Sequence, residues 1–139
     1  IGRGARPGNK FEPGKKPMST MAPTIIFDKD DKLFLITGSP GGSDIPAAIL
    51  RVITGVIDFD LDIGEATMLP RIHKDWPYTG LEHERAVSRD IVRRLKSMGH
   101  ETEYETTIGS TQSIHIVDGI NNGFADLRRP NAGVSVQSN

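Results

Sequence analysis

The stretch ITGSPGGSDIP, residues 36–46, joins a short apolar run that ends at Thr37 to an amphipathic run that begins at Ile45. This change of pattern across a group of glycines predicts a strand, a tight turn and a helix. Backbone N–H groups at the start of a helix lack partners within that helix. The stretch is therefore either a plain turn or a loop whose amides bind a negatively charged group.

The residues after the turn repeat with the period of a helix. Seven apolar residues follow one another at helical spacing, which places them on one broad face. These residues are Ile45, Ala48, Ile49, Val52, Ile53, Val56 and Ile57. Ser43 or Asp44 can cap this helix, and Pro46 suits its first turn.

Short apolar runs on both sides of this helix predict strands. TIIF (24–27) and KLFLIT (32–37) are expected to pair as a β-hairpin, and their nearly continuous apolar pattern indicates burial on both faces. Later stretches expected to hold further strands and turns are RIHKDW (71–76), GLEHE (80–84), ETEYET (101–106), QSIHIVDG (112–119) and GFADLRRP (123–130). Because hairpins are mixed with helices instead of alternating regularly with them, the sequence predicts an α+β fold.

Two further helices are expected. DIGEATMLP (62–70) predicts a short helix that Pro70 stops. SRDIVRRLKSM (88–98) predicts a longer helix, with Ser88 as its N-terminal cap and Gly99 as its C-terminal stop. The residues of this helix expected to face inward are Ile91, Val92, Leu95 and Met98.

Composition sets limits on the class of protein. The 139 residues suffice for one domain, and 36% hydrophobic with 25% charged residues is typical of a folded chain. A net charge of −1 gives no reason to expect a nucleic-acid partner. The absence of cysteine excludes disulfides and thiolate metal sites. The best apolar run, AAILRVITGVI (47–57), is too short for a transmembrane helix and carries Arg51.

The first part of the sequence differs from the rest. Residues 1–17 hold four glycines and three prolines without an apolar period, which is typical of a loop or linker. The folded part is expected to be 18–139. The opening IGRGARPGNK (1–10) reads like the interior of a loop, and several expected strands would lack partners in a domain of this size. We therefore expect a fragment or a processed chain that another segment completes.

Two short stretches carry groups suited to binding an anion. Gly41 and Gly42 let a ligand approach the backbone closely, and before a helix their amides can form an anion or oxyanion pocket. The alternative is a tight turn. Ser19 and Thr20 are adjacent hydroxyls that can bind a carboxylate, cap an element or face water. The arginines at 128–129 could also bind an acid group, but a solvated turn is favoured for them.

A metal site is not expected. The histidines fall on separate expected elements without paired-ligand spacing, and they are His73, His83, His100 and His115. Of these, His73 and His115 are expected at exposed strand positions. Three alternating acidic residues follow the long helix, and they are Asp58, Asp60 and Asp62. An inter-helix turn is favoured there, because the loop lacks the glycine and the terminal glutamate of a calcium site.

Six stretches, taken in order, resemble motifs of the γ-glutamyltranspeptidase family. EPGKKPMSTMAPTIIF (12–27) and FLITGSPGGSDIPAAIL (34–50) are similar to family stretches close to PGKRPLSSMSPTIV and TGSPGGSRI. VIDFDLDIGEATMLPRIH (56–73) resembles the family segment that ends in A-x-x-x-PR-x-H. KSMGHE, GSTQSIHI and ADLRRP resemble its later G-H, G-x-x-Q and D-x-RRP elements. The likeness covers most of residues 12–135.

The resemblance implies a fold and an activity. Members of this family are N-terminal-nucleophile hydrolases, αββα sandwiches with mainly antiparallel sheets. The family's precursor cleaves itself into a large and a small subunit, and the new N-terminal Thr is the nucleophile. It takes the γ-glutamyl group from glutathione or a related γ-glutamyl amide and passes it to water, an amino acid or a peptide. Residues 18–139 resemble the C-terminal part of the small subunit, and no cofactor is implied.

The same resemblance assigns roles to residues. Ser19 and Thr20 match two adjacent hydroxyl residues that hold the substrate α-carboxylate. The family commonly has Ser-Ser there, and Thr20 keeps the hydroxyl but adds a methyl group that stiffens χ1. Gly41 and Gly42 match the pair whose backbone amides form the oxyanion hole.

What the resemblance does not supply is a nucleophile. Ile1 stands where an N-terminal nucleophile would be Thr, Ser or Cys. The expected partners are the remainder of the small subunit and the large subunit, and the chain alone is not expected to catalyse. The family implies a periplasmic, extracellular or cell-surface location. Two other functions stay open: a glutaryl or cephalosporin-type acylase of the same superfamily, and a non-catalytic module that retains the fold.

Overall fold

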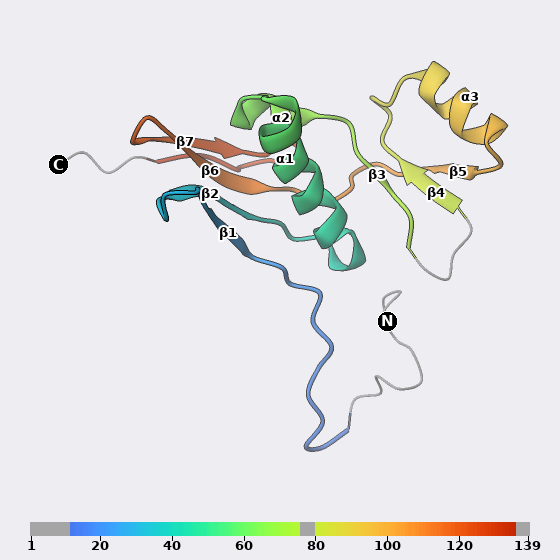
Figure 1. The fold of residues 1–139 in the computed structure, drawn as a ribbon. Helices are drawn as coiled ribbons and strands as arrows, with labels where there is room; N and C mark the ends of the chain where they lie inside the picture. The colour runs from blue at the N-terminus through green and yellow to red at the C-terminus, as the bar shows by residue number, and fades with distance from the viewer. Residues whose placement is uncertain (1–11, 76–79, 136–139) are drawn as a thin grey trace.

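The computed structural model describes residues 12–75 and 80–135. In these residues a four-stranded sheet lies beside a smaller three-stranded sheet (Figure 1). The strands are β1 Thr24–Phe27, β2 Leu33–Gly38, β3 Ile72–His73, β4 Gly80–His83, β5 Glu101–Tyr104, β6 Gln112–Val117 and β7 Ile120–Ala125. The helices are the 3₁₀ turn η2 Gly42–Asp44, α1 Ile45–Phe59, α2 Ile63–Met68 and α3 Arg89–Ser97.

The larger sheet is antiparallel throughout, in the order β1-β2-β6-β7. The predicted β1–β2 hairpin is confirmed, with Ile26 opposite Leu35. On its other side β2 pairs with β6, so that Gly38 lies opposite Gln112. This pairing brings the end of β2, where the glycine-rich turn begins, next to a segment that is distant in the sequence.

The core lies between this sheet and the two helices α1 and α2, which cover one face of it (Figure 1). Its buried members are Leu35, Val52, Val56, Ile63 and Ala66. The predicted apolar face of α1 is confirmed except at Ile57, which is 50% exposed. A Cβ at Gly55 would lie 2.9 Å from the Cβ of Ala66, so glycine lets α1 and α2 approach closely.

The turn between α1 and α2 confirms the inter-helix reading of the alternating aspartates. Asp60 ends α1 in the left-handed region at φ 57°. Asp62 begins α2, where its carboxylate accepts from the Glu65 N–H while Glu65 accepts from the Asp62 N–H. This reciprocal capping box satisfies backbone donors at the start of a six-residue helix.

The expectation that β1 and β2 are buried on both faces is wrong for the described residues. Ile25, Ile36 and Ile114 lie opposite one another on adjacent strands, on the sheet face turned away from the helices. Ile25 is 59% exposed, and Ile114 is also exposed. The apolar pattern is real, but the described part of the chain places helices against only one face.

The smaller sheet has the order β3-β4-β5 and contains a parallel pair. The helix α3 connects β4 to the parallel strand β5, which forms one βαβ unit beside otherwise antiparallel pairings. The strand expected over 71–76 is reduced to Ile72–His73, and residues 76–79 lie outside the described residues. The α+β class and the mainly antiparallel sheets are both confirmed.

The ends of α3 match the prediction, but its inward face does not. The Ser88 side chain accepts from the Ile91 N–H, and Gly99 follows the helix at φ +91°. Ile91 and Met98 are 52% and 64% exposed, whereas Val92 and Leu95 are half-buried. A nine-residue helix on a three-stranded sheet covers only a narrow stripe, which explains why its outer apolar positions stay exposed.

Residues 12–17 contain a turn and no helix or strand, and residues 1–11 lie outside the described residues. The boundary at residue 17 therefore stays a prediction. Among the described helices, none has both the length and the apolar character needed to cross a lipid bilayer.

Candidate active site

The glycine-rich turn adopts backbone conformations that favour glycine. Gly41 has φ +143° and Gly42 has φ +63°. A Cβ added at Gly41 would lie 3.2 Å from the Cα of Gly109, a backbone atom, whereas a Cβ at Gly42 would meet nothing within 4 Å. Gly41 is therefore required both by its φ angle and by a close neighbour, and Gly42 by its φ angle alone.

The carbonyl oxygens of the glycine turn accept hydrogen bonds within the chain. The Asp44 N–H donates to the Gly41 oxygen at 3.3 Å, and the Ile45 N–H donates to the Gly42 oxygen. Among the described residues, no hydrogen bond uses the N–H groups of Gly41 or Gly42. These two amides are free to donate to an external oxygen. The expected side-chain cap by Ser43 or Asp44 is not made, because the 3₁₀ turn occupies this position.

The second predicted stretch lies against this turn. The Thr20 Oγ1 donates to the Gly42 carbonyl oxygen at 2.7 Å, across 22 residues of sequence. The neighbouring Ser19 Oγ accepts from the Met21 N–H at 3.2 Å. A hydroxyl has one hydrogen to donate, so Thr20 uses its hydrogen on Gly42 while that of Ser19 stays available. The fold thus unites the two predicted stretches and gives their hydroxyls different roles.

A third segment, residues 108–111, packs against the turn. The sequence did not predict this contact. The Ser110 N–H donates to the Ser39 Oγ at 2.8 Å, and that hydroxyl donates to the Pro40 oxygen at 2.7 Å. Gly109 has φ +68°, and a Cβ there would lie 2.6 Å from the Cβ of Ala48. The only signal in the sequence was the Gly-Ser pair within GSTQSIHI.

A buried ion network fixes this third segment. The Arg71 side chain is 1% exposed, and its guanidinium donates to Asp126 Oδ2 at 2.8 Å and to the Ile108 oxygen at 2.9 Å. The Arg128 guanidinium donates two parallel hydrogen bonds, of 2.6 and 2.7 Å, to the Glu84 carboxylate. The expectation of a solvated turn is wrong for Arg128, which lies inside this network, and right for the exposed Arg129.

Both carboxylates of the network are ionised at neutral pH. Burial acts to raise the pKa of Asp126, but hydrogen bonds from the Arg128 and Thr111 backbone amides and a neighbouring arginine lower it below its usual range. Burial likewise acts to raise the pKa of Glu84, and the Arg128 hydrogen bond and two backbone amides lower it. The carboxylates accept from the Thr111 and Ile108 N–H groups and so hold the segment behind the glycine turn.

A family model described as gamma-glutamyltranspeptidase matches residues 2–136. The chain belongs to the gamma-glutamyltranspeptidase family. It is 40% identical to the glutathione hydrolase proenzyme of Escherichia coli over 121 residues, which is 86% of this chain and 21% of that protein. The glutathione hydrolase proenzyme of Bacillus subtilis is 36% identical over 92% of this chain and 22% of its own length. The chain thus spans about a fifth of the length of these curated relatives.

Solved structures agree with the family assignment. The crystal structure of the Helicobacter pylori gamma-glutamyltranspeptidase T380A mutant superposes with a TM-score of 0.82 at 34% identity, over 89% of this chain and 69% of that one. A cephalosporin acylase from Bacillus halodurans has a TM-score of 0.73 at 23% identity, over 80% of this chain and 21% of its own, which shows a shared fold alone. The expected N-terminal-nucleophile hydrolase fold is therefore confirmed, with this chain as one part of it.

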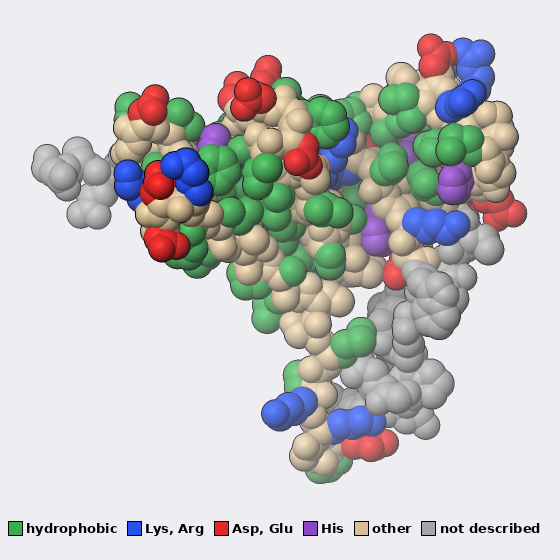
Figure 2. Space-filling view, viewed as in Figure 1, with side chains coloured by type: hydrophobic (Ala, Val, Ile, Leu, Met, Phe, Trp, Pro, Cys, Tyr) green, Lys and Arg blue, Asp and Glu red, His purple; other side chains and the backbone are tan. Residues whose placement is uncertain are grey.

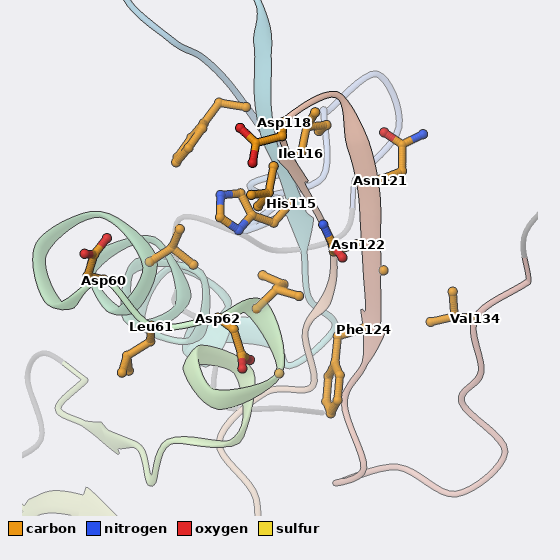
Figure 3. A pocket seen from close by; sticks show the side chains of 16 residues that line it. Asp60, Leu61, Asp62, His115, Ile116, Asp118, Asn121, Asn122, Phe124 and Val134 are labelled. Atoms are coloured by element: carbon orange, nitrogen blue, oxygen red, sulfur yellow. The ribbon is translucent and has the colours of Figure 1, made fainter.

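A cavity in this gamma-glutamyltranspeptidase segment lies apart from the glycine turn. A volume of about 1000 Å³ opens between the end of α1, the start of α2 and the β6–β7 hairpin (Figure 3). Asp60, Asp62 and His115 are among its lining residues, and none of the four predicted site residues is. The candidate site is therefore an open loop and not this pocket.

Two histidines are less exposed than predicted. His115 is half-buried, its ring meets that of Phe34 edge-on at 4.7 Å, and burial lowers its pKa. His73 is mostly buried and lies 3.6 Å from the Asp44 carboxylate. The expectation of exposed strand positions is wrong for both, because β2 and the start of α1 pack against them.

Proposed function

We propose that this chain is the C-terminal part of the small subunit of an enzyme that cleaves γ-glutamyl amides such as glutathione. The γ-glutamyl group would pass to water, an amino acid or a peptide. The observation that carries the proposal is the Thr20–Gly42 hydrogen bond, which unites the two anion-binding stretches beside two free backbone amides. The names of the relatives as glutathione hydrolases support the substrate class.

The free amides of Gly41 and Gly42 suit the charge that develops during acyl transfer. When a nucleophile attacks the γ-amide carbon, the carbonyl oxygen becomes an oxyanion, and two convergent N–H groups can stabilise it. One good donor contributes about 3–4 kcal/mol. The C–N bond then breaks, the amine leaves with a proton, and water or an acceptor amine attacks the resulting ester. The nucleophile itself would come from the N-terminal residue of the small subunit.

Ser19 is the better candidate of the two hydroxyl residues for the substrate α-carboxylate. The Ser19 hydroxyl hydrogen is available, whereas the Thr20 hydroxyl hydrogen is donated to the Gly42 carbonyl oxygen. In this proposal Ser19 binds a permanent anion, and Thr20 positions the glycine turn. Both residues would keep the substrate carboxylate a short distance from the oxyanion donors.

Further segments of the same precursor are proposed to cover the apolar surfaces that this chain leaves open. The sheet face that carries Ile25 and Ile114 has no helix against it in the described residues. Hydrophobic side chains also gather on the surface over α1 (Figure 2), where the exposed ones are Leu50, Ile57 and Phe59.

An acivicin-inhibited gamma-glutamyltranspeptidase with a TM-score of 0.82 is described as having critical roles for its C-terminus in autoprocessing and catalysis. A periplasmic or extracellular location stays a prediction from the family.

Replacing Ser19 by alanine in the complete enzyme is expected to raise KM for a γ-glutamyl anilide by about 10- to 100-fold, since a hydrogen bond to a charged group is worth about 1.5–3 kcal/mol. The kcat value should change much less. Thr20→Val should instead lower kcat, because it removes the contact with Gly42, and Thr20→Ser should restore it. Steady-state kinetics of the three variants test these roles, and an unchanged KM in Ser19→Ala would contradict the assignment.

An acylase for glutaryl-type side chains is the second candidate, favoured by the fold shared with the cephalosporin acylase. A glutaryl donor keeps the terminal carboxylate of a γ-glutamyl donor and lacks only its α-amino group. Ser19 could bind the carboxylate of either donor, so the residues that contact the α-amino group would distinguish the two functions. A non-catalytic module that keeps the fold is the third candidate, and an upstream Thr nucleophile in the precursor would exclude it.

A further inference from the structure

Two acidic side chains and one histidine converge where the start of α1 meets the smaller sheet. Asp44, His73 and Glu82 each offer one ligand atom, and these atoms all lie within 4.8 Å of one another. Asp44 directly follows the glycine turn, and His73 and Glu82 are opposite one another on the antiparallel strands β3 and β4. The cluster thus joins two parts of the fold that the sequence keeps apart.

Glu82 is buried in this cluster and the other two residues are half-buried, unlike the exposed acidic groups that are common on protein surfaces. Glu82 is 7% exposed, and the side chains of His73 and Asp44 are 11% and 20% exposed. His73 Nε2 is fully buried and has no hydrogen-bond partner in the structure. Asp44 Oδ1 lies 3.6 Å from this nitrogen, beyond hydrogen-bonding distance. A buried ring nitrogen without a hydrogen bond is costly unless something else binds it.

We propose that Asp44, His73 and Glu82 form a binding site for a divalent transition-metal ion such as Zn²⁺. One imidazole nitrogen and two carboxylate oxygens are a donor set that suits Zn²⁺, with metal–ligand distances of about 2.0–2.2 Å. Two such ligands of a tetrahedral ion lie about 3.3 Å apart. The 3.6 Å between His73 Nε2 and Asp44 Oδ1 therefore needs to close by only a few tenths of an ångström.

A cation bound by this cluster would stabilise the local fold. By binding Asp44, His73 and Glu82 together, it would link the start of α1 to β3 and β4. The Asp44 N–H donates to the Gly41 oxygen, so the ion would also stabilise the end of the glycine turn. Three protein ligands leave a coordination position for water, but the proposal concerns binding and stability, and it does not depend on the proposed enzymatic activity.

The test uses the complete protein, stripped of metal with a chelator and then given an equimolar amount of Zn²⁺. After gel filtration, elemental analysis is expected to find about one zinc ion per chain. His73→Gln and Asp44→Asn should each reduce the retained zinc by at least about tenfold. His100→Gln, a histidine outside the cluster, should retain zinc like the unchanged protein. Equal retention by His73→Gln and His100→Gln would overturn the proposal.

Co²⁺ provides a second measurement that does not require any variant to fold. When added to the metal-free protein, it should give visible absorption bands of a low-symmetry site with nitrogen and oxygen ligands, and equimolar Zn²⁺ should abolish them. Zn²⁺ should also raise the midpoint of thermal unfolding, since a ligand that binds only the folded state stabilises it. If the unchanged protein gives no Co²⁺ absorption bands and retains no zinc, the site is refuted.

Discussion

Replacing Gly41 by alanine in the complete enzyme is expected to lower kcat for γ-glutamyl transfer by about 100- to 1000-fold, with little change in KM. Alanine cannot adopt φ +143° without strain, and its Cβ would lie 3.2 Å from the backbone of Gly109. The turn would have to move, and its amides would no longer point at the oxyanion. The Ser19 hydroxyl would remain, which is why substrate binding should persist. Steady-state kinetics with a γ-glutamyl anilide measure both constants.

Gly42→Ala is the matched comparison for this prediction. Gly42 has φ +63°, and a Cβ there would meet no atom within 4 Å. A left-handed alanine costs about 1–2 kcal/mol, so kcat should fall by only about 10-fold, and again more than KM rises. A kcat unchanged in Gly41→Ala, or a smaller loss there than in Gly42→Ala, would contradict the oxyanion role of the turn.

Replacing Arg71 by alanine is expected to lower the free energy of unfolding by about 3–5 kcal/mol. The Arg71 guanidinium binds Asp126, the Thr111 hydroxyl and the carbonyl oxygens of Thr67 and Ile108. Its removal would leave the Asp126 charge buried with fewer partners and several acceptors unpaired. Urea unfolding of the complete protein, followed by circular dichroism, measures the loss.

Arg129→Ala is the control for this second prediction. Arg129 is exposed and lies directly beside Arg128, so its removal changes the same charge without touching the network. Its free energy of unfolding should stay within about 0.5 kcal/mol of the unchanged protein. Equal losses in Arg71→Ala and Arg129→Ala would show that the buried network contributes no special stability.

Local patterns in the sequence predicted the elements well. The helical spacing from Ile45 onward fixed α1 and its buried face, because the period of a helix appears directly in the order of residues. The β1–β2 hairpin and the Ser88 cap were equally local features. Burial was misjudged at Ile25 and Ile91: the pattern was correct, but both side chains stay more than half exposed among the described residues.

Contacts between distant segments could not be predicted from the sequence. Arg71 and Asp126 form their ion pair across 55 residues, and neither has a neighbour in the sequence that signals a buried charge. The sequence predicted that the stretches with Thr20 and Gly42 both bind anions. It did not predict that the Thr20 hydroxyl donates to the Gly42 carbonyl oxygen. The approach of His73 to Asp44 depends on how the smaller sheet packs against the start of α1.

Turnover of two matched donors by the complete protein tests the proposed function most directly. A γ-glutamyl anilide and a glutaryl anilide release the same coloured amine and differ only in the α-amino group of the donor. We expect the complete protein to hydrolyse the γ-glutamyl anilide, to do so faster when an acceptor dipeptide is added, and to cleave the glutaryl anilide at least about 100-fold more slowly. Preference for the glutaryl anilide would identify an acylase, and no turnover of either donor by a protein with an intact N-terminal Thr would contradict the proposed function.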